Sequence, residues 1–292
     1  MRNSTSILIS IIFTLINLGA KAEIIDSNNP YNHNKSNTPT SINCYLSPEH
    51  KIMQTFYIDV HKNTVWLTYD NEKRNHQIIE TYDKNKNLLD RQDYSGESSI
   101  GHLDGIYIDD DIIYATDKYT NPSIIKLKNK KIISRLQYPK NIIGNQVLAI
   151  DRNKKNNFIL WATEDKSKNK IIYVGKFDKE NENIKNLYIS KIVYPQSAVL
   201  QGLVLSNDTA YALTGSPNAP VILYSWNISS GDLIEKNILN FNLDKFGDNL
   251  KYEPEGLNII TDKNNKKKLL IGLTINTTQN KTFNCIVTYS NY

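Results

Sequence analysis

Five segments of similar pattern recur along the chain, and they constrain its fold more than any other feature. Each begins with an acid or an amide and continues with alternating apolar residues. The distances between their first residues are 50, 42, 55 and 54 positions. A recurring unit of this length is typical of stacked supersecondary modules. The segments are 54–59, 104–109, 146–151, 201–206 and 255–260.

Each segment is followed by further short runs that are rich in β-branched and aromatic residues, which is typical of strands. The second run of every unit ends on Thr, and the fourth run is more polar than the first. A radial four-stranded sheet has this gradient, because its inner strand is buried between neighbouring blades and its outer strand faces water. Helical spacing is marginal and confined to 240–250. A β-sandwich has too few strands for about twenty runs, so we expect an all-β, five-bladed β-propeller.

The fifth unit lacks a fourth strand, whereas residues 41–47 form a strand-like run with no unit of its own. We expect this N-terminal strand to complete the last blade and close the ring. Cys44 lies in the N-terminal run and Cys285 in the third run of the fifth unit. Neighbouring strands can bring two Cβ atoms within disulfide range, so a Cys44–Cys285 bond is predicted. The alternative is two unrelated buried thiols.

The first 22 residues have the pattern of a signal peptide, with Arg2, an apolar run over 7–20 and a small-x-small site at 20–22. An uncleaved anchor is the competing interpretation. Residues 23–40 are rich in Asn, Ser, Thr and Pro and are expected to be a disordered leader, followed by the propeller domain at 41–292. We therefore expect a secreted protein, or a periplasmic one in a Gram-negative source, without stable membrane insertion.

The charge balance gives no indication of nucleic acid as a partner. Removing residues 1–22 takes away Arg2 and Lys21, so 33 basic residues remain against 30 acids, a formal charge of +3. The basic residues are scattered or lie in short runs between strands, which is typical of solvated turns.

The first residues of the inner strands should converge on the mouth of the central channel, because inner strands line the axis of a propeller. Gly follows three of them, at Gly105, Gly202 and Gly256, where backbone or a ligand can approach closely. Two further polar residues, His102 and Glu253, lie just outside the ring. The predicted ring is Gln54, Asp104, Gln146, Gln201 and Glu255.

Several kinds of chemistry fit such a ring. Carboxylate and amide oxygens could hold Ca²⁺, with Asp104 and Glu255 as the candidate ligands. They could equally bind sugar hydroxyls, or a carboxylate near His102 could act in general acid–base catalysis. Polar residues in this position also often satisfy only each other and a column of water. The sequence has no Gly-x-Ser-x-Gly elbow, His-Glu-x-x-His motif or zinc-type cysteine spacing.

The segments 252–257 and 201–211, together with Gly101-His102 followed by Asp104, resemble a known propeller family. That family joins helveticin J-like bacteriocins, the teichoic-acid-associated protein C of bacilli and a receptor-binding domain of staphylococcal phages. The resemblance covers roughly residues 42–292 and implies a five-bladed propeller that acts at bacterial surfaces by binding. A cleavable signal and a Cys44–Cys285 bond depart from that family, which puts a bacteriocin role in doubt.

The sequence thus leads to a secreted, monomeric binding module that recognises glycans or cell-wall polymers. The alternative is a Ca²⁺-dependent hydrolase of the lactonase or esterase type, with its site at the channel mouth and with Asp104, Glu255 and His102 as its residues. A bacteriocin that kills related cells is a third hypothesis, although no pore-forming helix supports it.

Overall fold

The computed structural model of the chain describes the residues from Thr38 to Ser290, with gaps. The predicted signal peptide, the leader up to residue 37 and the predicted ring residue Gln146 lie outside this part. The described ranges are 38–46, 52–70, 77–94, 100–117, 123–137, 149–150, 158–164, 170–178, 181, 183–189, 199–217, 219–248, 250–262 and 264–290. No helix among these residues is long and apolar enough to cross a membrane.

Twenty strands in the described residues form five antiparallel sheets of four strands each. Among the described residues of the predicted 240–250 stretch, helical structure is confined to the one-turn 3₁₀ helix η3 (Asp244–Phe246). The strands are β1 (Ser41–Leu46), β2 (Ile52–Asp59), β3 (Thr64–Asp70), β4 (Gln77–Asp83), β5 (Leu88–Asp93), β6 (Ile106–Asp109), β7 (Ile112–Asp117), β8 (Ser123–Lys128), β9 (Lys131–Gln137), β10 (Ala149–Ile150), β11 (Phe158–Glu164), β12 (Lys170–Asp178), β13 (Asn183–Ile189), β14 (Leu200–Ser206), β15 (Thr209–Ser216), β16 (Ala219–Asn227), β17 (Leu233–Ile238), β18 (Lys251–Thr261), β19 (Lys267–Asn276) and β20 (Thr282–Ser290).

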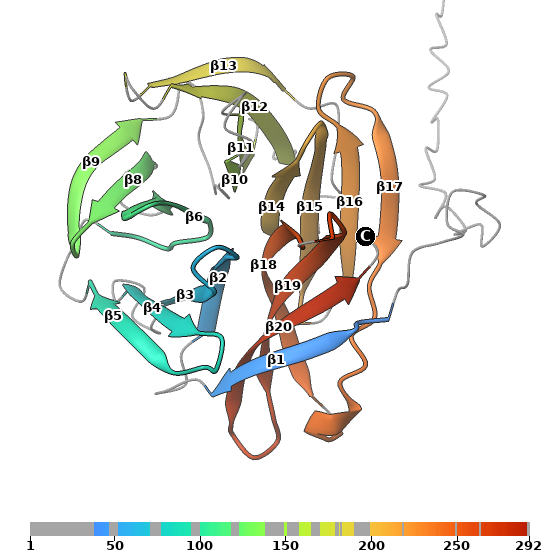
Figure 1. Ribbon diagram of the computed structural model, residues 1–292. Coiled ribbons are helices and arrows are strands. Elements are labelled where there is room, and N and C mark those ends of the chain that lie inside the picture. Colours follow the sequence, from blue (N-terminus) through green and yellow to red (C-terminus); the bar gives the residue numbers. More distant parts are fainter. Residues whose placement is uncertain are drawn as a thin grey trace, which may run out of the picture. The chain divides into compact units, whose positions relative to one another are not determined.

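The sheets stand around a common centre, and the first strand of each recurring unit is the innermost (Figure 1). These inner strands, β2, β6, β10, β14 and β18, contact one another in sequence, and β18 contacts β2 again. The outer positions are taken by β5, β9, β13, β17 and β1. The prediction of an all-β propeller is confirmed.

The hairpins opposite the first residues of the inner strands are built by an acid or amide at the strand end. Asp59 Oδ1 accepts hydrogen bonds from the N–H groups of His61 and Lys62, at 2.9 and 3.0 Å. Asp83, Asn227 and Asp262 serve the β4–β5, β16–β17 and β18–β19 turns in the same way. Such side chains replace the backbone partner that a tight turn lacks. The abundance of Asn and Asp in the sequence therefore has a structural use here.

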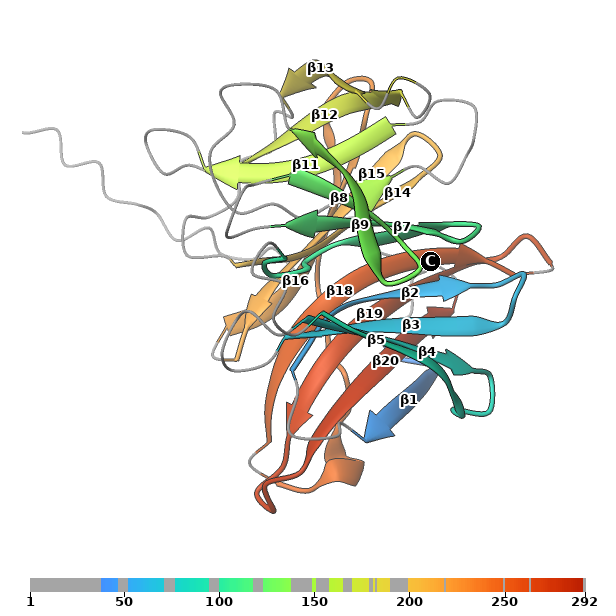
Figure 2. The same ribbon diagram turned by 90° about the vertical axis from the view of Figure 1, so that its left-hand side faces the viewer.

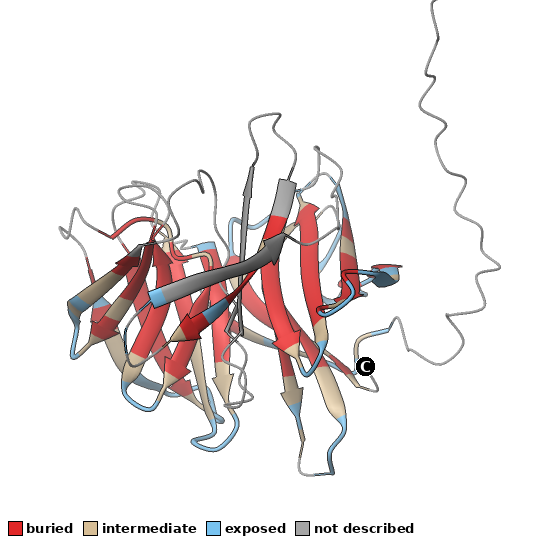
Figure 3. Cartoon of the chain, turned by 90° about the horizontal axis from the view of Figure 1, so that it is seen from above, coloured by how far each residue is buried: buried red, intermediate tan, exposed pale blue. Residues whose placement is uncertain are grey.

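The core lies between the sheets, where buried residues gather on the inner and middle strands (Figure 3). Each of four apolar clusters contains side chains from neighbouring sheets. Tyr114 of β7, for example, meets Phe177 of β12 edge to face, with ring centroids 5.5 Å apart. The hydroxyl of Tyr57 in β2 donates to the carbonyl of Ile108 in β6, at 3.1 Å. Hydrophobic burial, assisted by side-chain hydrogen bonds such as this one, therefore holds neighbouring sheets together, while backbone hydrogen bonds hold the strands of each sheet.

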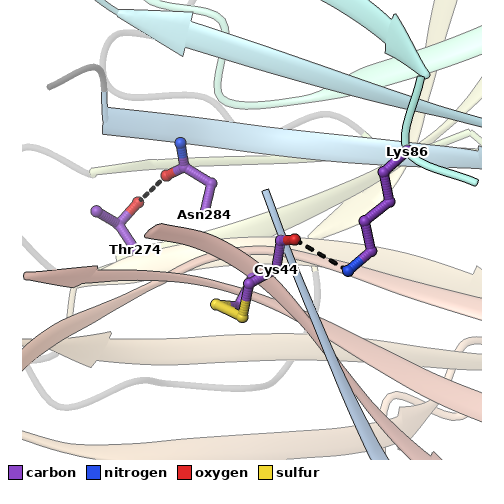
Figure 4. Close-up of a disulfide and its surroundings, with 5 residues drawn as sticks. Cys44, Lys86, Thr274 and Asn284 are labelled. Atoms are coloured by element: carbon purple, nitrogen blue, oxygen red, sulfur yellow. Dashed lines mark hydrogen bonds between the residues drawn. A yellow bond between two sulfur atoms is a disulfide. The ribbon is translucent and has the colours of Figure 1, made fainter. Parts of the chain in front are cut away.

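Strand β1 lies along β20, far from it in sequence, as two views of the structure show (Figures 1 and 2). The two strands pair antiparallel with Cys44 directly opposite Cys285, and these residues form a disulfide. Lys86, from the turn after β4, donates to the carbonyl oxygen of Cys44 at 3.1 Å (Figure 4). The ring of Tyr45 packs on that of Tyr82, with centroids 4.9 Å apart. The predicted disulfide is confirmed, and β1 touches the neighbouring sheet as well as its own.

Glycines allow the inner strands to approach one another closely. A Cβ on Gly202 of β14 would lie 2.7 Å from the Leu257 Cβ in β18. One on Gly256, whose φ is +90°, would lie 2.8 Å from Thr55 Oγ1 in β2. The sequence predicted a close approach at these two glycines by backbone or by a ligand, and it is the neighbouring strand that occupies the space.

Candidate functional site

Three of the five predicted ring residues lie at irregularities of the inner strands. The pairing register shifts between Met53 and Thr55, between Leu200 and Gly202, and between Pro254 and Leu257. Gln54, Gln201 and Glu255 are the residues at these shifts. A bulge takes a residue out of the ladder and changes the direction of its side chain, and it is common beside functional sites. Three sheets thus carry an equivalent distortion at the same end.

His102 lies between two carboxylates. Its Nδ1 is 2.8 Å from Asp70 Oδ2, and its Nε2 is 2.7 Å from Asp104 Oδ1. Carboxylate oxygens only accept, so both contacts are hydrogen bonds when the imidazole carries both protons. Asp70 ends β3, and Asp104 lies two residues before β6, so His102 links two sheets. All three side chains are between 10 and 15 % exposed.

The segment that carries His102 is fixed by buried groups on the second sheet. Asp117, at the end of β7, is fully buried and accepts a hydrogen bond from the N–H of Gly101 at 2.9 Å. Its other oxygen pairs with Arg135 at 2.5 Å. The hydroxyl of Thr116 accepts from the N–H of Gly105 at 3.0 Å. Thr116, the Thr with which the second run of this unit ends, therefore holds the segment just before β6.

Gln77, at the start of β4, hydrogen-bonds one of the two carboxylates that flank His102. It is fully buried, and its Nε2 donates to Asp70 Oδ1 at 2.9 Å. Its Oε1 has no hydrogen-bond partner in the structure. Such an orphan acceptor is costly unless a water or ligand donates to it.

Gln201 and Glu253 connect the fourth and fifth sheets. Gln201 Nε2 donates to Glu253 Oε1 at 3.0 Å. Burial raises the pKa of the Glu253 carboxyl above its ordinary value of 4.5, while the hydrogen bond from Gln201 and the attraction of His102 act in the opposite direction. The influence of His102 on the Glu253 carboxyl relates these two sets of side chains electrostatically. We call the two sets together the axial group; it consists of Asp70, Gln77, His102, Asp104, Gln201 and Glu253.

The structure brings together four of the seven predicted site residues: His102, Asp104, Gln201 and Glu253. Glu255 is buried beside Glu253 in the chain. Gln54 is 8 % exposed, and its side chain makes no hydrogen bond with any described residue. Within the described part of the chain, no three His, Cys, Asp or Glu side chains are grouped so that they could hold a metal ion. The Ca²⁺ ligands Asp104 and Glu255 remain a prediction.

Two members of the axial group, Asp70 and Gln77, were not predicted. They end the second strand and begin the third strand of the first sheet. In an antiparallel sheet these positions lie at the same end as the start of the first strand. The strand pattern alone could therefore have pointed to them.

The family is decided by a match over residues 114–287, which is more than half of the chain. The matching family is described as the phage 5-bladed beta propeller receptor binding platform domain. The chain belongs to this family. Within the receptor-binding platform match lie Gln201, Glu253 and Glu255, whereas the axial residues of the first sheet precede it. The predicted resemblance to phage receptor-binding propellers is confirmed, while that to helveticin J and teichoic-acid protein C stays a prediction.

A solved phage structure shows the same fold as this receptor-binding platform domain. The tail fiber of Staphylococcus aureus phage P68 is 16 % identical with a TM-score of 0.61, over 86 % of this chain and 53 % of that chain. The chain thus spans about half of the tail fiber's length. Hydrazine synthase of Kuenenia stuttgartiensis is 11 % identical (TM-score 0.40, 80 % and 66 % covered), and a Mycobacterium tuberculosis puromycin-hydrolyzing peptidase is 10 % identical (0.41, 79 % and 35 %). No curated protein matches the chain.

Proposed function

We propose that this chain is a secreted binding module that recognises a glycan or polymer of the cell surface through its axial group. The family supports receptor binding as the activity. The observation that carries the place of binding is the array of partly exposed polar side chains around His102, drawn from four sheets at one end of the inner strands. Loops and strand ends that gather polar groups on a rigid scaffold are the usual location of binding sites.

The proposed scaffold is a ring of five blades in which β1 serves as the outer strand of the last blade. Five four-stranded sheets, the pairing of β1 with β20 and the Cys44–Cys285 bond support it. The chain completes its last sheet with its own strand and needs no second copy for this, so we propose a monomer. A disulfide is stable in an oxidising compartment, which supports secretion and cleavage of the signal peptide at residues 20–22.

Hydroxyl-rich polymers suit the chemistry of the axial group. Its carboxylates accept hydrogen bonds, and sugar hydroxyls donate them. Because these side chains hydrogen-bond one another, and buried Asp117 holds the backbone of Gly101 beside His102, little ordering is needed when a ligand binds. The family favours receptor binding over hydrolysis, so the proposal is binding alone.

Sedimentation with intact bacteria and purified cell walls tests this function. A panel that includes Staphylococcus aureus should contain at least one surface that the protein binds saturably. The double variant His102→Ala/Gln201→Ala should bind at least about tenfold more weakly, because it removes side chains from both halves of the group. Asp111→Ala is the control, since Asp111 pairs with Lys128 at the opposite end of the inner strands. Absence of binding across the panel, or equal binding by the double variant, would refute the proposal.

A further inference from the structure

Within the axial group, each imidazole or amide nitrogen already faces a carboxylate. The two ring nitrogens of His102 face Asp70 and Asp104. The amide of Gln77 donates to Asp70, and that of Gln201 donates to Glu253. Two acceptors are left over: Oε1 of the fully buried Gln77 has no partner, and the described residues give Oε2 of Glu253 no donor. A ligand of this group must therefore bring donors of its own.

Glu253 also lacks a balancing charge. Its hydrogen-bonding partner Gln201 is a neutral amide. The imidazole of His102 has both ring nitrogens directed at other carboxylates, so it acts on Glu253 only through space. A half-buried carboxylate in this situation gains more from a cation than from a neutral donor, because a charged hydrogen bond is about twice as strong as a neutral one.

The excess of carboxylates in the axial group does not reflect the charge of the whole protein. The whole chain carries a formal charge of +5, so the excess of carboxylates in the axial group is local. A basic protein repels cationic polymers in general. A preference for a cation would therefore have to arise at a specific place.

We propose that the ligand presents a positively charged amine to Glu253, and that the axial group thus selects amine-bearing polymers over neutral ones. This inference rests on the proposed function and narrows it to one chemical class. The amine would donate to Glu253 Oε2, since the side chain of Glu253 is partly exposed. Binding should then weaken as salt rises, since the interaction is partly exposed to solvent.

A pair of matched polymers tests the inference. Dextran carrying primary aminoethyl groups and the same dextran after N-acetylation differ in charge and little else. At pH 7 the wild-type protein should bind the amine form at least about tenfold more tightly. In Glu253→Gln the two affinities should become equal. Glu235→Gln is the matched control, because Glu235 also accepts from a neutral amide, that of Asn237 in β17, and lies outside the axial group.

The outcomes separate this inference from the proposed function. Equal affinity of the wild type for both polymers, a preference that persists in Glu253→Gln, or no binding of either polymer by a protein that still binds cells would overturn the amine proposal alone. A protein that binds no cell surface would overturn both. If Glu253→Gln does not fold, Gln201→Glu places a second carboxylate beside the first and should increase the preference for the amine form; a decrease would contradict the inference.

Discussion

The side-chain oxygen of Asn284 in β20 accepts a hydrogen bond from the backbone N–H of Met53 in β2, at 3.2 Å, across 231 positions of sequence. The same oxygen accepts from the hydroxyl of Thr274 at 2.9 Å (Figure 4). Asn284 and Met53 are fully buried. The side-chain amide of Asn284 therefore links the sheet of β18–β20 to the sheet of β2–β5.

Replacing Asn284 by Ala should destabilise the protein by about 2–4 kcal/mol, because two buried donors lose their acceptor. Urea unfolding monitored by tryptophan fluorescence measures the change. Asn276→Ala is the control, since Asn276 is exposed and its side-chain oxygen accepts from Thr282 within one hairpin. The cost of this substitution should stay below about 1 kcal/mol. Equal effects of the two substitutions would show that the link between the sheets contributes nothing.

Removing the disulfide with Cys44→Ala/Cys285→Ala should lower the free energy of unfolding by up to about 5.5 kcal/mol, the chain-entropy value for a loop of this length. The two residues are 241 positions apart. Thermal unfolding with and without reductant checks this. Reductant should lower the melting temperature of the wild type and leave the double variant unchanged; a reduced wild type that melts as before would contradict the expected role of the bond.

The sequence predicts the strands and their order well, because alternation and turn residues are local signals. It also predicts the Cys44–Cys285 bond, since that follows from which strands are neighbours. His102 and Asp104 could be placed at one end of the inner strands for the same reason. These features depend on strand order alone.

Pairings between side chains of different sheets could not be predicted. That His102 lies between Asp70 and Asp104, and that Gln201 bonds Glu253, depends on bulges and on the rotation of one sheet against the next. Neither is encoded in the spacing of residues. For a similar reason, the sequence could not predict which residue packs against Gly256. It indicates that a close approach occurs there, but not that Thr55 makes it.

Gly256 provides a test of how tightly the inner strands pack. Ala at this position would strain a φ of +90° and bring its Cβ within 3.1 Å of the Thr55 Cα. We expect a loss of about 2–4 kcal/mol from strain and overpacking together. Gly247 has a similar φ of +99° but no neighbouring atom within 4 Å, so Gly247→Ala should cost only about 1 kcal/mol. Comparable losses for both, measured by urea unfolding, would show that the contact with β2 is not tight.

The carboxyl of Glu253 should make stability depend on pH. Burial, its dominant influence, raises the pKa above 4.5, so the folded protein binds the proton more tightly than the unfolded chain. The stabilisation from protonation is complete below pH 4.5 and is lost as the pH rises through the raised value. Glu253→Gln keeps an acceptor for Gln201 and removes the charge. The variant should therefore melt up to about 3 °C above the wild type at pH 7, with the gap closing towards pH 4. A gap that does not change with pH, or a wild type that is more stable at pH 7, would mean that Gln201 and His102 already balance the charge, and the argument for an unbalanced carboxylate would be lost.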